Sequence, residues 1–445
     1  MLDQSFSADN FRQILDYENR KGLYLEGKYF PEVARVKEEI KQLNIAIKAK
    51  KGVVSPEAFE LFVKETNIKI EELKVKKDEL LNKELQKVSE KIINDKFKIA
   101  ITKNDAISDK PVYTIDDKPE NFFALKQIQQ NFRKLYKVKQ SSRYSILSQI
   151  KVLLNDKFPK YVIRTDIENF YESIPHDRLL HKLNEENLLT FSSKRIISQI
   201  LNEYKKLSGS TTQGLPRGIG ISAYLSELYM RDIDRLIKNI PSVTYYARYV
   251  DDIIIIFTPT TKKEPRDYID KIDEIIETKF GLTRNEEKTV PFDLIDLSTS
   301  NSFEYLGYKI TFGHNGVSFD LTTNKQSRYK SRIDSTITAY INYAKVDEKK
   351  ARKLLIKRIR FLTGNTKLIN NKKNVLVGVY YSNNLLTNSS VFKGIDSYLK
   401  HQVTTRIAST KIHERIDKYK FYEGFMNKRF SSFKSSDLSK ILEIY

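Results

Sequence analysis

The sequence predicts an α+β fold in which an antiparallel sheet lies between helical segments at the two ends of the chain. Three observations predict it. The first hundred residues carry helical periodicity, the middle alternates short β-rich runs with helical stretches, and the last part is helical and strongly basic. A strand–helix–strand order with a central β-hairpin favours helices packed on one face of the sheet. We therefore expect three domains, at residues 1–100, 101–320 and 321–445.

The N-terminal part is expected to form a helical hairpin or coiled coil. Apolar residues recur at three- and four-residue spacing among alternating charges throughout residues 32–100. Gly52 and the residues up to Ser55 interrupt this pattern, and Pro56 suits the first turn of a new helix behind a serine cap. The simplest interpretation is a packing or oligomerisation element. The sequence is equally compatible with RNA binding or with contact to a partner protein.

The middle part contains several short runs rich in β-branched and aromatic residues. They read KYVIRTDI (160–167), TYYARYV (244–250), DIIIIF (252–257), FEYLGYKI (303–310) and GVSFDL (316–321). Amphipathic stretches typical of helices lie between the first and second runs and between the third and fourth. Two strand-like runs that almost touch at residues 250–252 predict a tight hairpin at the centre of the sheet.

Composition excludes several classes of function. The chain has 445 residues, of which 40% are hydrophobic, so it can bury substantial cores. It contains no cysteine, which excludes disulfides, zinc–thiolate sites and thiol catalysis and fits a reducing cytoplasm. The first residues resemble no secretory signal, and the longest apolar run is far shorter than the roughly 20 residues of a membrane helix. We expect a soluble cytoplasmic protein with no membrane association.

Positive charge is concentrated near the C-terminus. The chain carries a formal net charge of +21. From residue 321 onward, 26 lysines and arginines stand against 9 acidic residues, a net of +17. Such an excess predicts a polyanionic partner, because each neutralised phosphate releases a counterion. The alternative is a solvated surface in a chain rich in Lys, Asn and Ile.

The strongest chemical signal is the adjacent pair Asp251 and Asp252. The pair lies between two apolar strand-like runs, where buried carboxylates are costly unless cations neutralise them. A tight hairpin would present both at the rim of the sheet, and Asp166, at the end of the run YVIRT, could add a third from a neighbouring strand. Three carboxylates around two Mg²⁺ ions would form a two-metal site for phosphoryl transfer. An ordinary Asp-Asp turn is the alternative for the pair by itself.

Here the chain resembles reverse transcriptases. Five sequence blocks occur in the order typical of that family: TDIENFYESIPHDRLL (165–180), QGLPRGIGISAYLSELYM (213–230), ARYVDDIIIIF (247–257), LTRNEEKT (282–289) and FEYLGYKI (303–310). The resemblance implies a right-hand polymerase fold with fingers, an antiparallel palm sheet and a basic helical thumb-like domain.

The resemblance also implies roles at the catalytic centre. Asp166 and Asp251 would bind both metal ions, and Asp252 would be a nearby, partly structural carboxylate. The backbone carbonyl of Ile167 would be a further metal ligand. Lys288 would be the general acid for departure of pyrophosphate; a plain surface lysine is the alternative.

Other residues would contact the incoming nucleotide. Tyr171 falls at the steric gate that disfavours a ribose 2′-hydroxyl, and Phe170 would take this place if the register differs by one. Residues 136–154 resemble the fingers segment that contacts the triphosphate. Within it Arg143 is the first candidate, because its fork suits phosphate oxygens, and Lys139 is the second.

Two further motifs complete the candidate site. Leu306, Gly307 and Tyr308 would shape the primer grip. In the nucleotide-binding turn, Arg217 and Gly218 stand where many relatives have Gln-Gly. A permanent charge at this position could clamp phosphate or template and could alter substrate use.

The whole pattern predicts an RNA-directed DNA polymerase that uses two Mg²⁺ ions, dNTPs, an RNA template and a DNA primer or product. No ribonuclease H module or Cys-His endonuclease is recognisable. The resemblance is greatest to bacterial reverse transcriptases of phage defence and abortive infection, which implies a defence role with a dedicated non-coding RNA template. The alternatives are template-independent or protein-primed DNA synthesis, and a catalytically quiet nucleic-acid-binding scaffold. A hydrolase is the least favoured.

Overall fold

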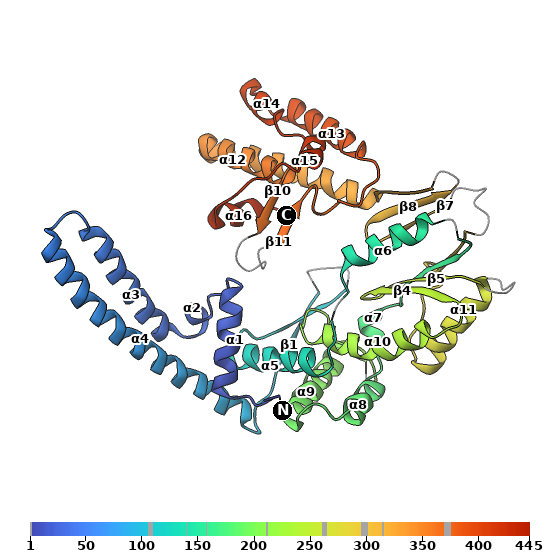
Figure 1. The fold of residues 1–445 in the computed structure, drawn as a ribbon, viewed down its shortest axis with the longest axis horizontal. Coiled ribbons are helices and arrows are strands. Elements are labelled where there is room, and N and C mark those ends of the chain that lie inside the picture. The colour runs from blue at the N-terminus through green and yellow to red at the C-terminus, as the bar shows by residue number, and fades with distance from the viewer. Residues whose placement is uncertain are drawn as a thin grey trace. The chain divides into compact units, whose positions relative to one another are not determined.

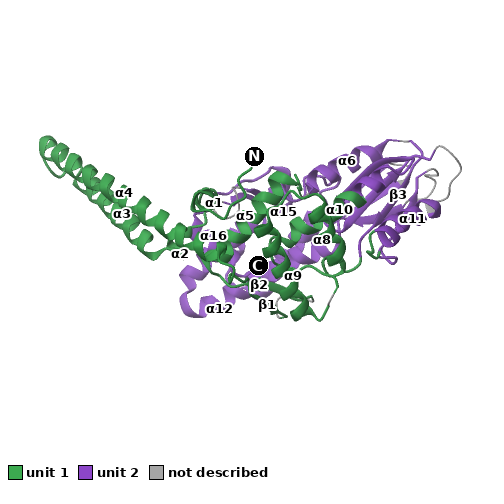
Figure 2. Cartoon of the chain, turned by 90° about the horizontal axis from the view of Figure 1, so that it is seen from below, with its two compact units in different colours: residues 1–139, 168–233, 280–283 green, residues 140–167, 234–279, 284–445 purple. Residues whose placement is uncertain are grey.

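The computed structural model describes residues 2–105, 110–139, 141–156, 158–210, 212–259, 265–294, 301–313, 316–368 and 375–445. The chain forms two compact units that interleave along the sequence (Figure 2). Unit 1 comprises residues 1–139, 168–233 and 280–283, and unit 2 comprises residues 140–167, 234–279 and 284–445. The three-domain division at residues 100 and 320 stays a prediction. No helix within the described ranges is long and apolar enough to cross a membrane.

The N-terminal helical hairpin predicted from the sequence is confirmed. Its arms are α3 (Pro31–Lys50) and α4 (Pro56–Ile93), which lie side by side in Figure 1. The hydroxyl of Ser55 accepts a hydrogen bond from the backbone N–H of Ala58, so the serine caps α4 as expected. The smaller helices α1 (Ala8–Arg20) and α2 (Leu25–Tyr29) pack against the base of the hairpin.

The rest of unit 1 is mainly helical, with one small hairpin. Its elements are β1 (Ile101–Asn104), β2 (Val112–Ile115), α5 (Pro119–Leu135), α7 (Phe170–Ser173), α8 (His176–Glu185), α9 (Phe191–Ser208) and most of α10 (Ser222–Lys238). Strand β2 is fixed to the turn before α10, because the N–H of Tyr113 donates to the carbonyl of Arg217 at 2.7 Å.

Unit 2 contains the antiparallel palm sheet that the sequence predicts. Its strands are β3 (Tyr161–Thr165), β4 (Val243–Tyr249), β5 (Asp252–Phe257) and β6 (Val290–Asp293), in the order β4-β5-β3-β6. All three neighbouring pairs are antiparallel. Strands β3 and β5 lie at the centre and are almost wholly buried, which explains their continuous apolar runs. The helices α6 (Arg143–Asn155), α11 (Pro265–Asp273) and the π-helical turn Glu274–Lys279 also belong to this unit.

A second antiparallel sheet in unit 2 carries the predicted primer-grip hairpin. Its strands are β7 (Asn301–Tyr305), β8 (Tyr308–Gly313) and β9 (Gly316–Leu321). Leu306 and Gly307 form the β7–β8 turn, both with positive φ. Helix α6 packs on this sheet through a shared apolar cluster that includes Leu147, Ile150 and Phe319.

The C-terminal part is mainly helical, as the sequence predicts, and its division as a separate thumb-like domain stays a prediction. Its elements are α12 (Thr323–Leu362), α13 (Val391–Arg406), α14 (Thr410–Ile416), α15 (Phe421–Met426), α16 (Ser435–Leu442) and the short strands β10 (Asn365–Leu368) and β11 (Val375–Gly378). Helix α12 is kinked at Asp347, where the backbone is extended and the carboxylate accepts the N–H of Lys350, as at a new helix start. One apolar cluster joins α12 to α13, α14 and α15.

Candidate active site

The sheet register brings the three predicted carboxylates to one rim of the palm. Tyr249 pairs with Asp252, so Val250 and Asp251 form a two-residue turn between β4 and β5. Asp166 directly follows β3, whose last residue pairs with Ile253 beside that turn. Val250 has a φ of 61°, which is strained for a β-branched residue and therefore indicates that the surrounding structure holds the turn in place.

The carboxylates repel one another. The pKa of Asp251 is raised, first by burial and then by the negative charges of Asp252 and Asp166. A backbone hydrogen bond at Asp251 and then the positive charge of Lys288 act in the opposite direction and lower this pKa. Such crowding of like charge in a partly buried turn costs free energy unless a cation neutralises it.

Two side-chain cations already neutralise part of this charge. The ammonium of Lys288 lies 2.7 Å from Oδ2 of Asp166, and the guanidinium of Arg164 lies 2.8 Å from Oδ1 of Asp252. Lys288 comes from the loop before β6, whereas Arg164 is part of β3 itself. Asp251 forms no such pair with any described residue.

The donor set fits a hard divalent cation. Asp166 is 7% exposed, and its Oδ1 atom is buried without a hydrogen-bond partner in the described part of the chain. Carboxylate oxygens are the ligands that Mg²⁺ prefers. In the side-chain positions described, however, no three Asp, Glu, His or Cys residues form a ready metal cluster. Binding would therefore require the Lys288 and Arg164 cations to move away from carboxylate oxygens that they occupy here.

The predicted backbone ligand is held at the same rim. Ile167 forms an isolated antiparallel bridge with Arg284, and the carbonyl of Asp166 accepts the N–H of Asn285 at 2.9 Å. Arg284 is itself anchored to Asp273 by a charged pair with a 2.9 Å contact. This bridge therefore fixes the chain just after β3, where Ile167 was predicted to contribute its carbonyl.

The buried Arg248 supports the turn at Val250 and Asp251, and the sequence analysis did not predict this role. Arg248 is 6% exposed, forms a two-pronged pair with Asp234 at 2.8 and 2.9 Å, and donates to the carbonyl of Val250 at 2.7 Å. The same carboxylate accepts from the hydroxyl of Tyr246. The sequence feature that could have predicted this role is a charged residue inside an otherwise apolar strand. Arg164 has the same feature.

In unit 1 the two candidate gate rings have different environments. Phe170 is 2% exposed and belongs to the core, whereas Tyr171 is half-buried. The guanidinium of Arg217 lies 5.5 Å from the Tyr171 ring centroid. Because its ring is more accessible, Tyr171 is the better candidate for the steric gate, as first expected. Its role as the gate stays a prediction.

Arg217 is part of an ion pair within unit 1. Its guanidinium contacts both carboxylate oxygens of Glu172 at 3.1 and 3.3 Å. The next residue, Gly218, has a φ of 100°, and a Cβ atom there would lie 2.7 Å from the carbonyl oxygen of Tyr113. Glycine is therefore required at this position. Lys139, the second triphosphate candidate, is exposed.

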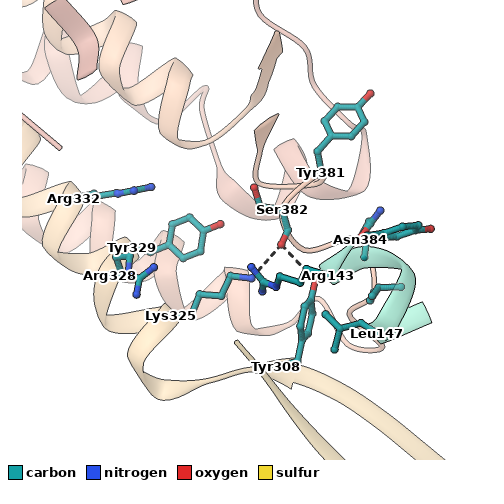
Figure 3. A pocket seen from close by; sticks show the side chains of 12 residues that line it. Arg143, Leu147, Tyr308, Lys325, Arg328, Tyr329, Arg332, Tyr381, Ser382 and Asn384 are labelled. Carbon is teal, nitrogen blue, oxygen red and sulfur yellow. Dashed lines mark hydrogen bonds between the residues drawn. The ribbon is translucent and has the colours of Figure 1, made fainter. Parts of the chain in front are cut away.

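In unit 2 Arg143 lies with the predicted primer grip. Its guanidinium is 5.8 Å from the ring centroid of Tyr308 (Figure 3), and a Cβ atom on Gly307 would lie 3.0 Å from one of its nitrogens. Tyr308 is buried, whereas Leu306 is half-buried in the turn. The predicted contact of Arg143 with a triphosphate stays a prediction.

Comparison with known proteins finds one family that matches part of the chain. Residues 101–310 match the family described as reverse transcriptase (RNA-dependent DNA polymerase). A comparison with curated proteins found no match.

Similar solved structures include fungal telomerases. Apo telomerase from Candida tropicalis is 14% identical, with a TM-score of 0.37 over 72% of this chain and 52% of that chain. Telomerase from Candida albicans in complex with a fragment of telomeric RNA is 14% identical, with a TM-score of 0.34 over 73% and 58%. The chain thus spans about half the length of these structures.

Proposed function

We propose that this protein is an RNA-directed DNA polymerase, a nucleotidyltransferase that adds dNTPs to a 3′-hydroxyl, because residues 101–310 match the reverse transcriptase family. The observation that carries the proposal is the crowding of Asp166, Asp251 and Asp252 at one rim of the palm, where burial and then the neighbouring negative charges raise the pKa of Asp251. A catalytically quiet scaffold would gain nothing from three carboxylates that repel one another.

The three carboxylates would hold two Mg²⁺ ions. When bound, such ions supply charge stabilisation to the attacking oxygen and to the leaving pyrophosphate. Asp166 and Asp251 would be shared ligands, the Ile167 carbonyl would add a backbone oxygen, and Asp252 would be a nearby, partly structural carboxylate. The buried Oδ1 atom of Asp166, which has no partner among described residues, supports this assignment.

Lys288 would supply a proton. Its ammonium lies 2.7 Å from Oδ2 of Asp166, so it is already positioned within the catalytic rim. Its side chain is 53% exposed, which leaves it room to turn toward a leaving pyrophosphate oxygen and act as general acid.

Substrate selection would depend on unit 1. Tyr171 would disfavour a 2′-hydroxyl, and the Arg217–Glu172 pair would restrain the residues around its ring. Because Glu172 neutralises Arg217, this arginine would act by orienting the turn more than by clamping phosphate. Lys139, Arg143 and Gly218 complete the proposed nucleotide-binding set.

The biological setting that we propose is anti-phage defence in the bacterial cytoplasm, with a dedicated non-coding RNA as template. The support is sequence resemblance, in the segments GLPRGIGIS (214–222) and VGVYYSNN (377–384). The helical hairpin α3–α4 would bind a second copy or a partner protein. A plaque assay with wild type and an Asp251→Asn, Asp252→Asn variant tests the setting, because protection should require both carboxylates.

Primer extension on RNA that copurifies with the protein tests the activity. Wild type, the Asp251→Asn, Asp252→Asn variant and an Asp270→Asn control are supplied with labelled dNTPs or rNTPs and Mg²⁺. Asp270 is an exposed residue of α11 outside the candidate site, and its substitution makes the same Asp→Asn change at one position. We expect a DNA product from wild type and control, and none from the double variant.

The other outcomes separate the alternatives. A product that forms without RNA would indicate template-independent synthesis, and a protease-sensitive product linked to the protein would indicate protein priming. If no variant incorporates label with either nucleotide type, in Mg²⁺ or Mn²⁺, the scaffold alternative replaces the polymerase proposal.

A further inference from the structure

The face of α4 that points away from α3 carries exposed apolar residues at seven-residue spacing. Leu61, Ile68 and Val75, which we call the α4 stripe, are 60%, 57% and 60% exposed. Val54, in the connection before α4, continues the series. Seven residues make almost two helical turns, so the three residues of the stripe share one face. Ile70, two residues after Ile68, is buried on the opposite side, where α3 runs beside α4 (Figure 1).

The α4 stripe ends where α4 enters the core of unit 1. The next position in the series is Asn82, and the neighbouring Leu81 and Leu85 are buried. Single exposed apolar residues are normal on a protein surface, but a series at constant spacing is the pattern through which one long helix packs along another. Because the stripe is exposed, packing within the described part of unit 1 does not account for it.

Acidic residues flank the stripe on both sides. The residues three and four positions after each member of the stripe lie beside it on the helix surface. Five of the six residues at these positions up to residue 79 are acidic, in a chain whose net charge is +21. The six residues are Lys64, Glu65, Glu71, Glu72, Asp78 and Glu79.

Glu65, Glu72 and Glu79 form an acidic edge along one side of the stripe. All three are exposed, and none forms an ion pair with a described residue. A lysine follows each of them four positions later, on the side away from the stripe, but no pair between a glutamate of the edge and its lysine forms in the described structure. The acidic edge is therefore free to contact a ligand that lies on the stripe.

The opposite edge carries less free charge. Glu71 pairs with Lys74 at 2.7 Å, and Asp78 pairs with Arg12 of α1 at 3.1 Å. Lys64 is the basic residue on this side. The acidic edge therefore decides which ligand suits the stripe.

The charges disfavour two other occupants of this face. Nucleic acid would place phosphates against the acidic edge, where like charges repel. A second copy of the chain, laid antiparallel on the stripe about Ile68, would bring Glu65 beside Glu72 of the second copy. A parallel second copy would bring Glu72 beside Glu71 of the second copy. Both arrangements oppose glutamates along the contact.

We propose that the α4 stripe docks a basic amphipathic helix of a partner protein. Apolar residues of that helix, seven positions apart, would pack on the stripe, and its lysines or arginines would face the acidic edge. Spacing argues for a helix as the ligand, because helices that pack lengthwise share this period. Charge complementarity argues for a basic one. The proposal rests on the binding role proposed for the α3–α4 hairpin and is independent of DNA synthesis.

The test uses the full chain and two synthetic helical peptides of about four heptads. Both peptides carry leucine at every seventh position. One has lysine at the two flanking positions of each heptad, and the other has glutamate there, with an otherwise identical sequence. Binding is measured by fluorescence anisotropy at low and high salt, because a charge-selected contact weakens as salt increases.

Two exposed positions of α4 are compared with two matched positions of α3. Ile68→Ser is paired with Ile45→Ser, since Ile45 is a similarly exposed isoleucine at 48%. Glu72→Lys is paired with Glu39→Lys, since Glu39 is an exposed glutamate without an ion pair in the described structure. All four changes lie on exposed surface, so the fold should persist, and thermal unfolding of each variant checks this.

We expect wild type to bind the lysine peptide at least about tenfold more tightly than the glutamate peptide. Ile68→Ser should weaken binding of the lysine peptide about five- to tenfold, because less apolar area is buried, whereas Ile45→Ser should leave it unchanged. Glu72→Lys should reduce the preference between the peptides by about threefold or more. Glu39→Lys should not change that preference.

The opposite results overturn the proposal. If wild type binds neither peptide, or binds both equally, the face does not select a basic helix. If Ile68→Ser binds the lysine peptide as Ile45→Ser does, binding lies elsewhere on the chain. If Ile68→Ser instead dissociates a dimer in analytical ultracentrifugation, or abolishes binding of an RNA duplex, the occupant is a second copy or RNA. Selective peptide binding by a wild type that makes no DNA would leave this proposal standing and refute only the polymerase.

Discussion

The palm rim and the acidic edge of α4 both concentrate negative charge, but only the rim is neutralised by cations of the chain itself. Asp166 and Asp252 each have a side-chain cation within 2.8 Å, whereas Glu65, Glu72 and Glu79 form no ion pair in the described structure. Burial explains the difference, because partly buried carboxylates are costly without a counterion, whereas water solvates exposed ones. The rim keeps exchangeable cations where metal ions would bind, and the acidic edge leaves its charge to a basic partner.

Two groups of unit 2 predict opposite responses to pH, namely Asp251 at the rim and Lys325 in the first turn of α12. The raised pKa of Asp251 means that the folded state holds its proton more tightly than the unfolded state, so stability falls as the pH rises through the carboxylate range. Burial lowers the pKa of Lys325 to about 7, so the unfolded state binds more protons between about pH 7 and 10.5 and stability rises across that window. Added Mg²⁺ should remove the cost at Asp251.

The largest effect is expected from Asp251→Asn, Asp252→Asn. DNA synthesis should fall at least about 10³-fold, because the carboxylates that would hold the metal ions are lost. Stability near neutral pH should rise, since the repelling charges are gone. Primer extension and thermal unfolding with and without Mg²⁺ measure both. A variant that still melts at a higher temperature when Mg²⁺ is added would show that the rim is not the metal site.

Lys288→Met distinguishes a proton donor from a mere counterion. Loss of a general acid should lower kcat about 10²-fold while Mg²⁺ binds at least as well, because Asp166 loses a competing cation. Steady-state kinetics across a Mg²⁺ titration measure the two effects separately. Lys288→Arg is the matched control, since it keeps the charge but donates a proton poorly. Unchanged kcat with tighter Mg²⁺ binding would show that Lys288 is only a counterion of Asp166 and not a proton donor.

Arg164→Met tests the second counterion of the rim. Asp252 would lose its partner, so the half-saturating Mg²⁺ concentration should fall by about three- to tenfold as competition disappears. Stability without metal should fall by about 1–3 kcal/mol, because a partly buried carboxylate is left unpaired. Denaturant unfolding and metal titration check these values. Weaker Mg²⁺ binding would mean that Arg164 orients Asp252 for the metal instead of competing with it.

The smallest effect is expected at the Glu172–Arg217 pair of unit 1, which is neutralised like the rim but carries no surplus charge. A double-mutant cycle with Glu172→Gln and Arg217→Gln should give a coupling free energy of about 0.2–1 kcal/mol, because both side chains are partly exposed. The choice between dNTPs and rNTPs should shift only a fewfold. A large rise in KM for dNTPs with Arg217→Gln alone would instead show that Arg217 contacts the nucleotide.

Much of the fold follows from local pattern. The periodic helical arms, the continuous apolar runs of the central strands and the tight turn at Val250 and Asp251 are readable because each depends on neighbouring residues. The three carboxylates are recognisable for the same reason, since charge at the end of a buried strand is costly wherever the strand lies.

The sequence by itself determined which residue types stand at the ends of the palm strands and where the helices begin. Only the tertiary structure decided which cation faces which carboxylate, that Arg248 supports the turn through Asp234, and that Arg143 meets Lys325 beside Tyr308. The physical reason is that these contacts join segments far apart in the chain. Their geometry is set by strand register and helix packing. Neither can be predicted from a local pattern of residues.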